Sequence, residues 1–187
     1  MNMFLNEKSN GKKMVDKVFK AAVAANIAKE KHGDKVVNAT LGTLFDENGV
    51  FVALESVWGP YETIENIQKA KYASSIQGNP GFRDAVYNWL FDGLDEKIEC
   101  EIIATPGGAG AITSTLKNIL NPGETVVKPS QGWGPYKTMA FENDLTLTDY
   151  NMFKNGEFDL SDFEKTLNKV MEIQGKVLVI INDPCHN

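Results

Sequence analysis

A glycine-rich turn carries the clearest chemical signal in the sequence. The segment Thr105-Pro106-Gly107-Gly108-Ala109-Gly110-Ala111 follows the apolar run 102–104 and leads into a helical pattern that reaches Leu120. A strand, a glycine turn and a helix in this order offer backbone N–H groups and the positive end of a helix dipole to an anion. No lysine follows the glycines as in a P-loop, and the spacing is not G-x-G-x-x-G. The layout favours a single bound phosphate, and a plain glycine turn closing one βα unit is the alternative.

Two other segments carry aromatic or amide side chains at the ends of predicted strands. The segment 130–136 contains Trp133 and Tyr136 and follows the predicted strand 125–128, and the segment 182–187 follows the apolar run 177–181. In an open parallel sheet, ligands bind at the carboxyl ends of the strands. An anion site, a flat aromatic ring and an amide at that edge suit a planar, phosphorylated, hydroxyl-bearing ring. Pyridoxal phosphate is such a ligand.

The elements that must position these segments alternate regularly in the second half of the chain. Apolar runs predict strands at 102–105, 125–128, 145–150 and 177–181, and helical periodicity predicts helices at 109–120, 136–141 and 161–172. A capping box at Ser161 is predicted to open the last helix. The run 177–181 is continuous enough to predict a strand buried on both faces. This alternation predicts an α/β fold with a parallel sheet.

The first half reads differently, as helices joined by extended segments. An apolar stripe predicts a helix over 14–31 with Gly33 just past its end. A turn at 46–49 predicts a β-hairpin or a pair of extended segments. Asn79 and Pro80 predict the start of another helix, which Gly93 ends. The remaining expectations are extended segments at 36–42 and 50–54, a loop at 56–61 and a helix at 61–73.

Composition excludes several classes of protein. The chain has 187 residues with 42% hydrophobic and 24% charged residues, which is ordinary for a globular protein. Its net charge of −6 argues against an electrostatic nucleic-acid binder. No signal peptide or apolar run of membrane-spanning length is present, so no membrane association is expected. Cys100 and Cys185 have no CxxC partner and are expected to be reduced thiols in a cytoplasmic protein.

With these segments in order, the chain resembles the N-terminal half of a class I/II aminotransferase, a fold-type-I pyridoxal-phosphate enzyme of the aspartate and aromatic aminotransferase kind. The resemblance spreads over most of the sequence and rests on five segments in the family's order. These are Asn38–Gly49, Tyr72–Arg83, the glycine turn 105–111, the aromatic loop Trp133–Tyr136, and Asn182–Asn187 as the start of a motif ending H-N-P-T-G.

The resemblance implies a role for each matched segment. Gly107, Gly108 and Ala109 would bind the phosphate of pyridoxal 5'-phosphate, and Ala109 stands where the family often has threonine or serine. Trp133, in preference to Tyr136, would stack on the pyridine ring. The other implied contacts are Asn187 with the cofactor's phenolic oxygen, Tyr72 with the cofactor phosphate of a neighbouring subunit, and Gly42 beside the substrate carboxylate.

The resemblance also implies the architecture. We expect a three-layer αβα pyridoxal-phosphate transferase fold with an incomplete, parallel-rich sheet and an N-terminal helical and extended segment. Residues 1–55 would form an arm and small-domain segment, and residues 56–187 the first part of the large cofactor-binding domain. The chain stops after a predicted buried strand, where a loop should lead to the next helix, so a truncated C-terminus is expected.

The implied activity is the transfer of an amino group between an α-amino acid and a 2-oxo acid, in a homodimer when complete. None of the lysines lies in the context of the family's Schiff-base lysine, so no catalytic residue is assigned and the chain alone is expected to be inactive. Another pyridoxal-phosphate enzyme of the same fold, a lyase or synthase, stays open, as does a non-catalytic cofactor-binding module. A dinucleotide-binding oxidoreductase is disfavoured because Lys128-Pro129 occupies the region where an acidic residue is required.

Overall fold

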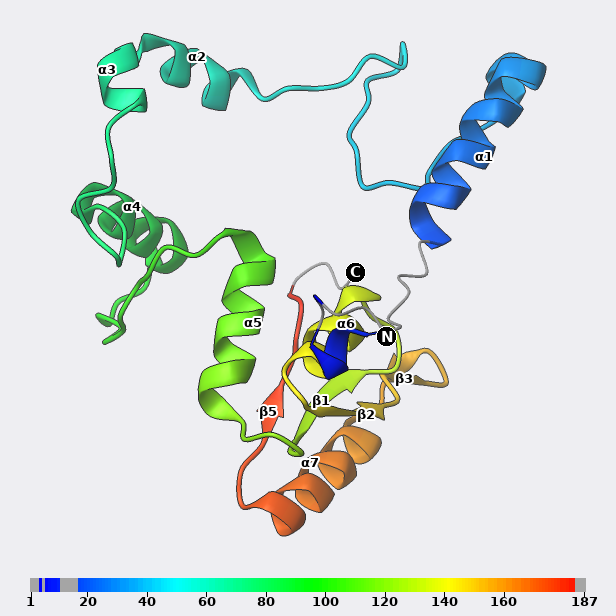
Figure 1. The fold of residues 1–187 in the computed structure, drawn as a ribbon, viewed down its shortest axis with the longest axis vertical. Coiled ribbons are helices and arrows are strands. Elements are labelled where there is room, and N and C mark those ends of the chain that lie inside the picture. The colour runs from blue at the N-terminus through cyan, green and yellow to red at the C-terminus, as the bar shows by residue number, and fades with distance from the viewer. Residues whose placement is uncertain (1–3, 5, 11–16, 184–187) are drawn as a thin grey trace. The chain divides into compact units, whose positions relative to one another are not determined.

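The computed structural model describes residue 4, residues 6–10 and residues 17–183. The chain divides into two compact units, Met1–Lys71 and Tyr72–Asn187. The predicted boundary after residue 55, between a small-domain segment and the large domain, stays a prediction. Figure 1 labels most of the helices and strands of both units.

Unit 1 consists of short helices and extended chain with few buried side chains. The predicted first helix is present as α1, although of its residues only Ala22 is buried and the expected apolar stripe, including Val18 and Phe19, is largely exposed. Lys29, Lys31 and His32 lie in its last turn, where positive charge complements the helix dipole. The elements of unit 1 are η1 (Glu7–Ser9), α1 (Lys17–His32), η2 (Gly33–Lys35), α2 (Glu55–Thr63) and α3 (Asn66–Lys69).

The predicted hairpin of unit 1 is reduced to one antiparallel bridge, between Phe45 and Phe51. The turn between them is the predicted one, since the Asp46 carboxylate accepts the N–H groups of Asn48 at 2.9 Å and Val50 at 2.7 Å. No strand forms over 36–42 or 50–54. The predicted turn is therefore confirmed, and of the two predicted alternatives the structure has a pair of extended segments, joined by this one bridge.

The predicted loop at 56–61 is also wrong, because α2 covers it. Pro60 lies inside this helix, and the Thr63 hydroxyl donates to the Pro60 carbonyl at 2.7 Å. Gly59 and Pro60 favour a turn by composition, but Pro60 lies inside the helix, where its missing N–H removes one helical hydrogen bond. Of the helix expected over 61–73, residues 61–63 belong to the end of α2 and residues 66–69 form the single turn α3.

Unit 2 is built on a three-stranded sheet of order β2-β1-β5, in which both pairings are parallel. Val126 pairs with Leu147 and with Leu178, so β1 is the central strand (Figure 1). The predicted parallel α/β fold is thus confirmed. The elements of unit 2 are α4 (Pro80–Phe91), α5 (Gly107–Ile119), β1 (Thr125–Pro129), α6 (Pro135–Glu142), β2 (Thr146–Tyr150), β3 (Phe153–Lys154), β4 (Glu157–Phe158), α7 (Leu160–Gln174) and β5 (Leu178–Val179).

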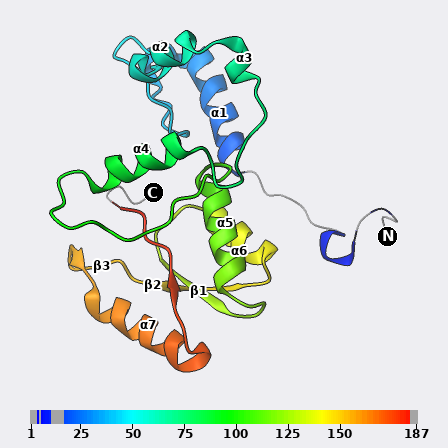
Figure 2. The same cartoon turned by 90° about the vertical axis from the view of Figure 1, so that its left-hand side faces the viewer.

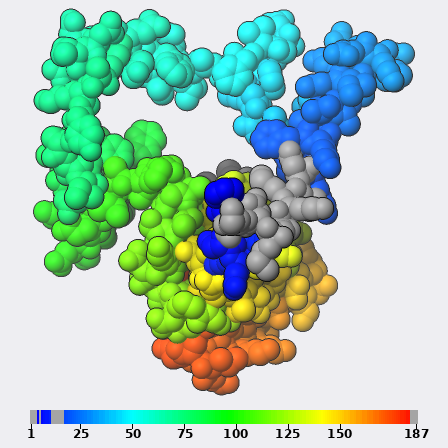
Figure 3. All heavy atoms as spheres, viewed as in Figure 1, coloured from blue at the N-terminus to red at the C-terminus, as the bar shows by residue number. Residues whose placement is uncertain are grey.

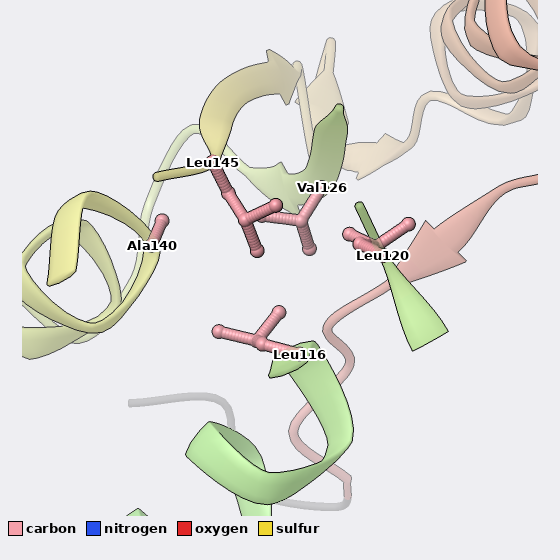
Figure 4. Packing of buried hydrophobic residues seen from close by; sticks show 5 residues of the cluster. All are labelled: Leu116, Leu120, Val126, Ala140 and Leu145. Carbon is pink, nitrogen blue, oxygen red and sulfur yellow. The ribbon is translucent and has the colours of Figure 1, made fainter. Parts of the chain in front are cut away.

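Helices cover both faces of this sheet. Consecutive residues of a strand point to opposite faces, and the two buried valines of β1 divide accordingly. Val126 packs with Leu116, Leu120, Ala140 and Leu145 from the side of α5 and α6 (Figure 4). Val127 packs with Tyr150 and with Val170 of α7, and Figure 2 shows α7 on the other side of the strands from α5. The result is a three-layer arrangement, and Figure 3 shows residues 107–180, green through red, as one continuous packed mass.

The face of the sheet that α7 covers contains an aromatic cluster. The rings of Tyr150, Phe158 and Phe163 meet edge to face, with centroids 4.8 to 6.2 Å apart. Burial raises the pKa of the Tyr150 phenol above its ordinary value, because the charged form loses its hydration. Phe158 belongs to the β3–β4 hairpin, whose turn residues Asn155 and Gly156 both have positive φ, as a type I′ turn requires.

Three predictions for unit 2 are wrong in detail. The expected strand 102–105 joins no sheet, and its Ala104 N–H donates to the Gln77 carbonyl at 2.9 Å. The strand expected over 177–181 is present as the shorter β5, which lies at the edge of the described sheet. It is therefore less buried than predicted, and Ile181 is 64% exposed. Asp159, and not Ser161, caps α7, because the Asp159 side chain accepts the Asp162 N–H at 3.1 Å.

The helix α4 begins as predicted. Its N-cap is Asn79, whose side chain accepts the Phe82 N–H at 2.7 Å, and Pro80 occupies the first helical position. Its predicted apolar face is not buried among the described residues, since Trp89 is 86% exposed. No helix of the described chain is long and apolar enough to span a membrane.

Candidate functional site

The glycine turn and the start of α5 form the first wall of the candidate site. Pro106 has φ −71° and ψ 72°, and the Gly107 N–H donates to the Thr105 carbonyl at 2.7 Å. This is an inverse γ-turn. The Thr105 hydroxyl closes the turn by donating to the Gly107 carbonyl at 3.0 Å. Gly107 itself has φ +69°, a conformation that favours glycine. The chain is thereby turned sharply into the helix.

This turn changes the set of available donors. The sequence predicted that Gly107, Gly108 and Ala109 all offer an N–H group to phosphate, but that of Gly107 is used inside the turn. The first N–H groups of an α-helix have no partner within the helix, which leaves those of Gly108 and Ala109 at the open end of α5. These two groups, reinforced by the dipole of a 13-residue helix, form a small anion site.

Two glycines of this segment are needed for different physical reasons. A Cβ at Gly110 would lie 2.6 Å from Pro106 Cδ, so the proline ring fits over the first helical turn only because residue 110 has no side chain. A Cβ at Gly108 would meet no heavy atom within 4 Å. The space beside Gly108 is therefore open to a ligand, whereas the space beside Gly110 is occupied by the Pro106 ring.

An aromatic pair forms the second wall. The rings of Trp133 and Tyr136 meet edge to face, with centroids 5.6 Å apart and planes at 84°. Tyr136 is buried at 4% exposure, whereas Trp133 is 37% exposed. The Tyr136 N–H donates to the Trp133 carbonyl at 3.1 Å, which fixes the loop at the start of α6. Trp133 is the ring of the two that has surface available to a ligand.

The third wall is the chain that continues from β5. The Ile180 N–H donates to the Val127 carbonyl at 2.9 Å, so the chain still follows β1 beyond the last residue of the strand. It then reaches Ile181 and Asn182. Because β1 and β5 are parallel, their carboxyl ends lie at the same edge of the sheet, which explains why the loop of Trp133 and the segment of Asn182 meet there.

These three walls line one open cavity of about 580 Å³. The helix α5 and the strand β5, which carry two of the walls, are labelled in Figures 1 and 2. The sequence-predicted residues Gly108, Ala109 and Trp133 line it together. None of the described residues in its lining carries a charge, so its positive potential comes from the N-terminus of α5. The other lining residues are Ala111, Ile112, Thr115, Leu116, Tyr136, Leu178, Val179, Ile180, Ile181 and Asn182.

The remaining predicted residues are Tyr72, Gly42 and Asn187. Tyr72 belongs to unit 2 but is 93% exposed and does not line it. Gly42 belongs to unit 1, is exposed, and a Cβ there would meet nothing within 4 Å. Asn187 lies outside the described residues. No group of histidine, cysteine, aspartate and glutamate side chains in the described chain could hold a metal ion.

Sequence reasoning missed the apolar part of the lining, and it included Asn182 only as part of the segment 182–187. Ile112 and Thr115 lie on one face of α5, three residues apart, and no motif singled them out. Asn182 directly follows the last apolar residue of the run 177–181, so its place at the carboxyl edge of the sheet was the available signal.

Comparison with known proteins places this geometry in a family. The family model described as aminotransferase class I and II matches residues 35–187. The structure superposes on a crystal structure of an aminotransferase from Anaerococcus prevotii with a TM-score of 0.89 and 28% identity, covering 97% of this chain and 44% of that chain.

Two curated relatives show the same pattern of partial coverage. A histidinol-phosphate aminotransferase of Sulfurisphaera tokodaii is 36% identical over 83 residues, which are 44% of this chain and 22% of the relative. An aspartate aminotransferase of Musicola paradisiaca is 29% identical over 111 residues, which are 58% of this chain and 27% of the relative. The chain therefore matches less than half the length of each protein compared.

Proposed function

The chain belongs to the class I and II aminotransferase family, and on this premise we propose that it is the cofactor-binding part of a pyridoxal-phosphate-dependent aminotransferase. The observation that carries the proposal is that Gly108, Ala109 and Trp133 line one cavity. A phosphorylated planar ring needs an anion site and an aromatic surface side by side, and this cavity has both. Titration with the phosphorylated and unphosphorylated forms of a pyridoxal analogue tests the proposal.

The residues present fit pyridoxal 5'-phosphate. The N–H groups of Gly108 and Ala109 would bind its phosphate, where charge-assisted hydrogen bonds are the strong ones, and the open space above Gly108 admits a phosphate oxygen. Trp133 would cover one face of its ring. The predicted contact of Asn187 with the phenolic oxygen remains part of the proposal. So does the assignment of residues 1–55 to a small-domain segment and of residues 56–187 to the large domain.

When bound, the cofactor supplies an electron sink for reactions at the Cα of an amino acid. The residues of this chain would contribute binding and orientation: the start of α5 holds the phosphate end, and Trp133 fixes the plane of the ring. The apolar side chains of Ile112 and Leu178 form part of the cavity wall. None of the described lining residues is a lysine, histidine, aspartate or glutamate. Proton transfer is therefore not assigned to this chain.

For the complete protein we propose transfer of an amino group between an α-amino acid and a 2-oxo acid, in a homodimer. The 93% exposure of Tyr72 supports its proposed contact with the cofactor phosphate of a second subunit. Gly42 is proposed to border the substrate carboxylate. The two curated relatives differ in the substrate named for them, so no particular amino acid is proposed. The cytoplasmic location stays a prediction.

A further inference from the structure

The segment between unit 1 and α4 contacts the chain that enters the glycine turn. The Gln77 carbonyl accepts the Ala104 N–H at 2.9 Å, and Ala104 is followed directly by Thr105 and the γ-turn. This hydrogen bond joins residues far apart in sequence, and it lies outside any sheet. The chain that enters the glycine turn is therefore held at Ala104 by a single backbone bond to the Gln77-Gly78 turn.

Gly78 makes this contact possible. It has φ +91°, and a Cβ on it would lie 2.9 Å from Ala104 Cβ and 3.3 Å from Phe82 Cδ1. A phenyl ring can rotate away, but the Cβ of alanine cannot move unless its backbone moves. The backbone of Ala104 thus lies against Gly78 at a distance that no other residue would permit.

The helix α4 holds the Gln77-Gly78 turn from the other side. Asn79 caps the helix and accepts the Arg83 N–H on its carbonyl at 3.2 Å. The Arg83 guanidinium reaches back, and its Nη1 donates to Gln77 Oε1 at 3.4 Å. The Arg83 Nε is buried and has no hydrogen-bond partner within the described part of the chain, so Gln77 Oε1 is the acceptor that links this guanidinium to the turn.

We propose that Gly78 and Arg83 are positioning residues for the phosphate site: they fix the turn that holds Ala104, and through Ala104 they set the direction of the Gly108 and Ala109 donors. The inference rests on the proposed function, because it assigns these residues to the same phosphate-binding turn. Neither residue lines the cavity, so they act on a ligand only through the backbone.

The experiment compares dissociation constants for pyridoxamine 5'-phosphate and pyridoxamine, measured calorimetrically on the whole chain. Pyridoxamine has no aldehyde and does not label surface lysines. The dissociation constant of pyridoxamine divided by that of pyridoxamine 5'-phosphate measures how much the phosphate group contributes to binding. We expect Gly78→Ala to lower this ratio roughly tenfold, about the loss of one charge-assisted hydrogen bond. Gly93→Ala is the matched control, because Gly93 also has positive φ, at +79°, but has open space around its Cβ position.

Arg83 is tested by Arg83→Met, which removes the donor, and by Arg83→Lys, which retains one donor for Gln77 and has no Nε. The ratio should fall in the first variant and recover in the second. A readout without ligand accompanies these titrations: the amide NMR resonances of Gly107 and Gly108 should shift in Gly78→Ala and Arg83→Met but not in Gly93→Ala.

If the unmodified chain does not prefer the phosphorylated form, the proposed function fails and the amide resonances alone decide the positioning role. Unshifted resonances in Gly78→Ala, or equal shifts in Gly93→Ala, would overturn the role of Gly78. A ratio that Arg83→Met leaves unchanged, or that Arg83→Lys lowers equally, would overturn the role of Arg83.

Discussion

The indole ring of Trp133 meets the phenol ring of Tyr136 edge to face, at 5.6 Å and 84°. The same relationship recurs in unit 1 between Trp58 and Tyr61, at 5.8 Å and 87°. Both pairs belong to the same tetrapeptide, Trp-Gly-Pro-Tyr, which occurs at 58–61 and 133–136. The ring pair is thus a local property of this tetrapeptide, which lies inside α2 in the first copy and at the start of α6 in the second. What distinguishes the second copy is its place beside the N-terminus of α5.

This duplication supplies a matched control for the proposed ring contact. Replacing Trp133 by leucine should weaken binding of pyridoxamine 5'-phosphate about tenfold, because the ring loses its aromatic cover. Trp58→Leu removes the same ring from the same tetrapeptide and should change the affinity less than twofold. Calorimetric titration of both variants measures the difference. Equal losses in the two variants would contradict the assignment of Trp133 as the ring contact.

The two glycines at the start of α5 should respond differently to alanine. Gly110→Ala places a Cβ against the Pro106 ring and should destabilise the chain by about 1–3 kcal/mol through overpacking. Gly108→Ala meets open space and should leave stability equal or raise it by up to ~1 kcal/mol, since alanine favours helix. Its methyl group would nevertheless hinder phosphate. Urea unfolding separates the two effects, and a destabilised Gly108→Ala variant would show that the turn geometry is different.

The parallel sheet could be predicted because its signals are local and agree with one another. The strand over 125–128 has an apolar run bounded by turn residues, and the structure has β1 at Thr125–Pro129. The run 102–105 has a similar composition and joins no sheet, because pairing depends on neighbours that a single segment does not reveal. Pro60 shows the opposite error: a residue typical of turns lies inside α2.

The candidate site was predicted in part for the same reason. Gly108, Ala109 and Trp133 were identified from motifs, and the structure brings them to one cavity. The engagement of the Gly107 N–H in a γ-turn could not be predicted, because it depends on the ψ of Pro106. The contact of Gly78 with Ala104 joins two separate segments, and no local pattern reports such a contact.

The edge of the sheet opposite the site is held by an ion pair whose strength depends on pH. Glu124 Oε2 lies 2.8 Å from Lys176 Nζ and accepts the Asn121 N–H at 2.6 Å. The hydrogen bond from Lys176, followed by that from the Asn121 backbone, holds the pKa of Glu124 below its ordinary value of 4.5. A carboxyl group whose pKa is lowered by folding stabilises the folded state above its unfolded pKa, and this contribution is lost as the pH falls through the folded pKa.

Glu124→Gln should therefore lower the urea midpoint at pH 7, and the difference from the unmodified chain should shrink as the pH falls below about 4.3. The exposed Glu101→Gln is the control and should show no such difference. A gap between Glu124→Gln and the unmodified chain that persists unchanged at low pH would indicate a packing effect and would contradict the electrostatic explanation.

The chain by itself should not transfer amino groups. The described residues that line the cavity include no lysine, histidine, aspartate or glutamate to move the proton at Cα. An assay with pyridoxal 5'-phosphate, a panel of α-amino acids and a 2-oxo acid acceptor should give no product above the rate with cofactor alone. Turnover above that rate would mean that another residue of this chain performs the proton transfer.

The most direct measurement is the affinity of the unmodified chain for pyridoxamine 5'-phosphate relative to pyridoxamine. Two backbone donors at the N-terminus of α5 should make the phosphorylated form bind at least about tenfold more tightly, since each hydrogen bond to a charged group contributes about 1.5–3 kcal/mol. The preference should disappear in competition with excess inorganic phosphate. Equal affinities for the two ligands would contradict the proposal that Gly108 and Ala109 form a phosphate site.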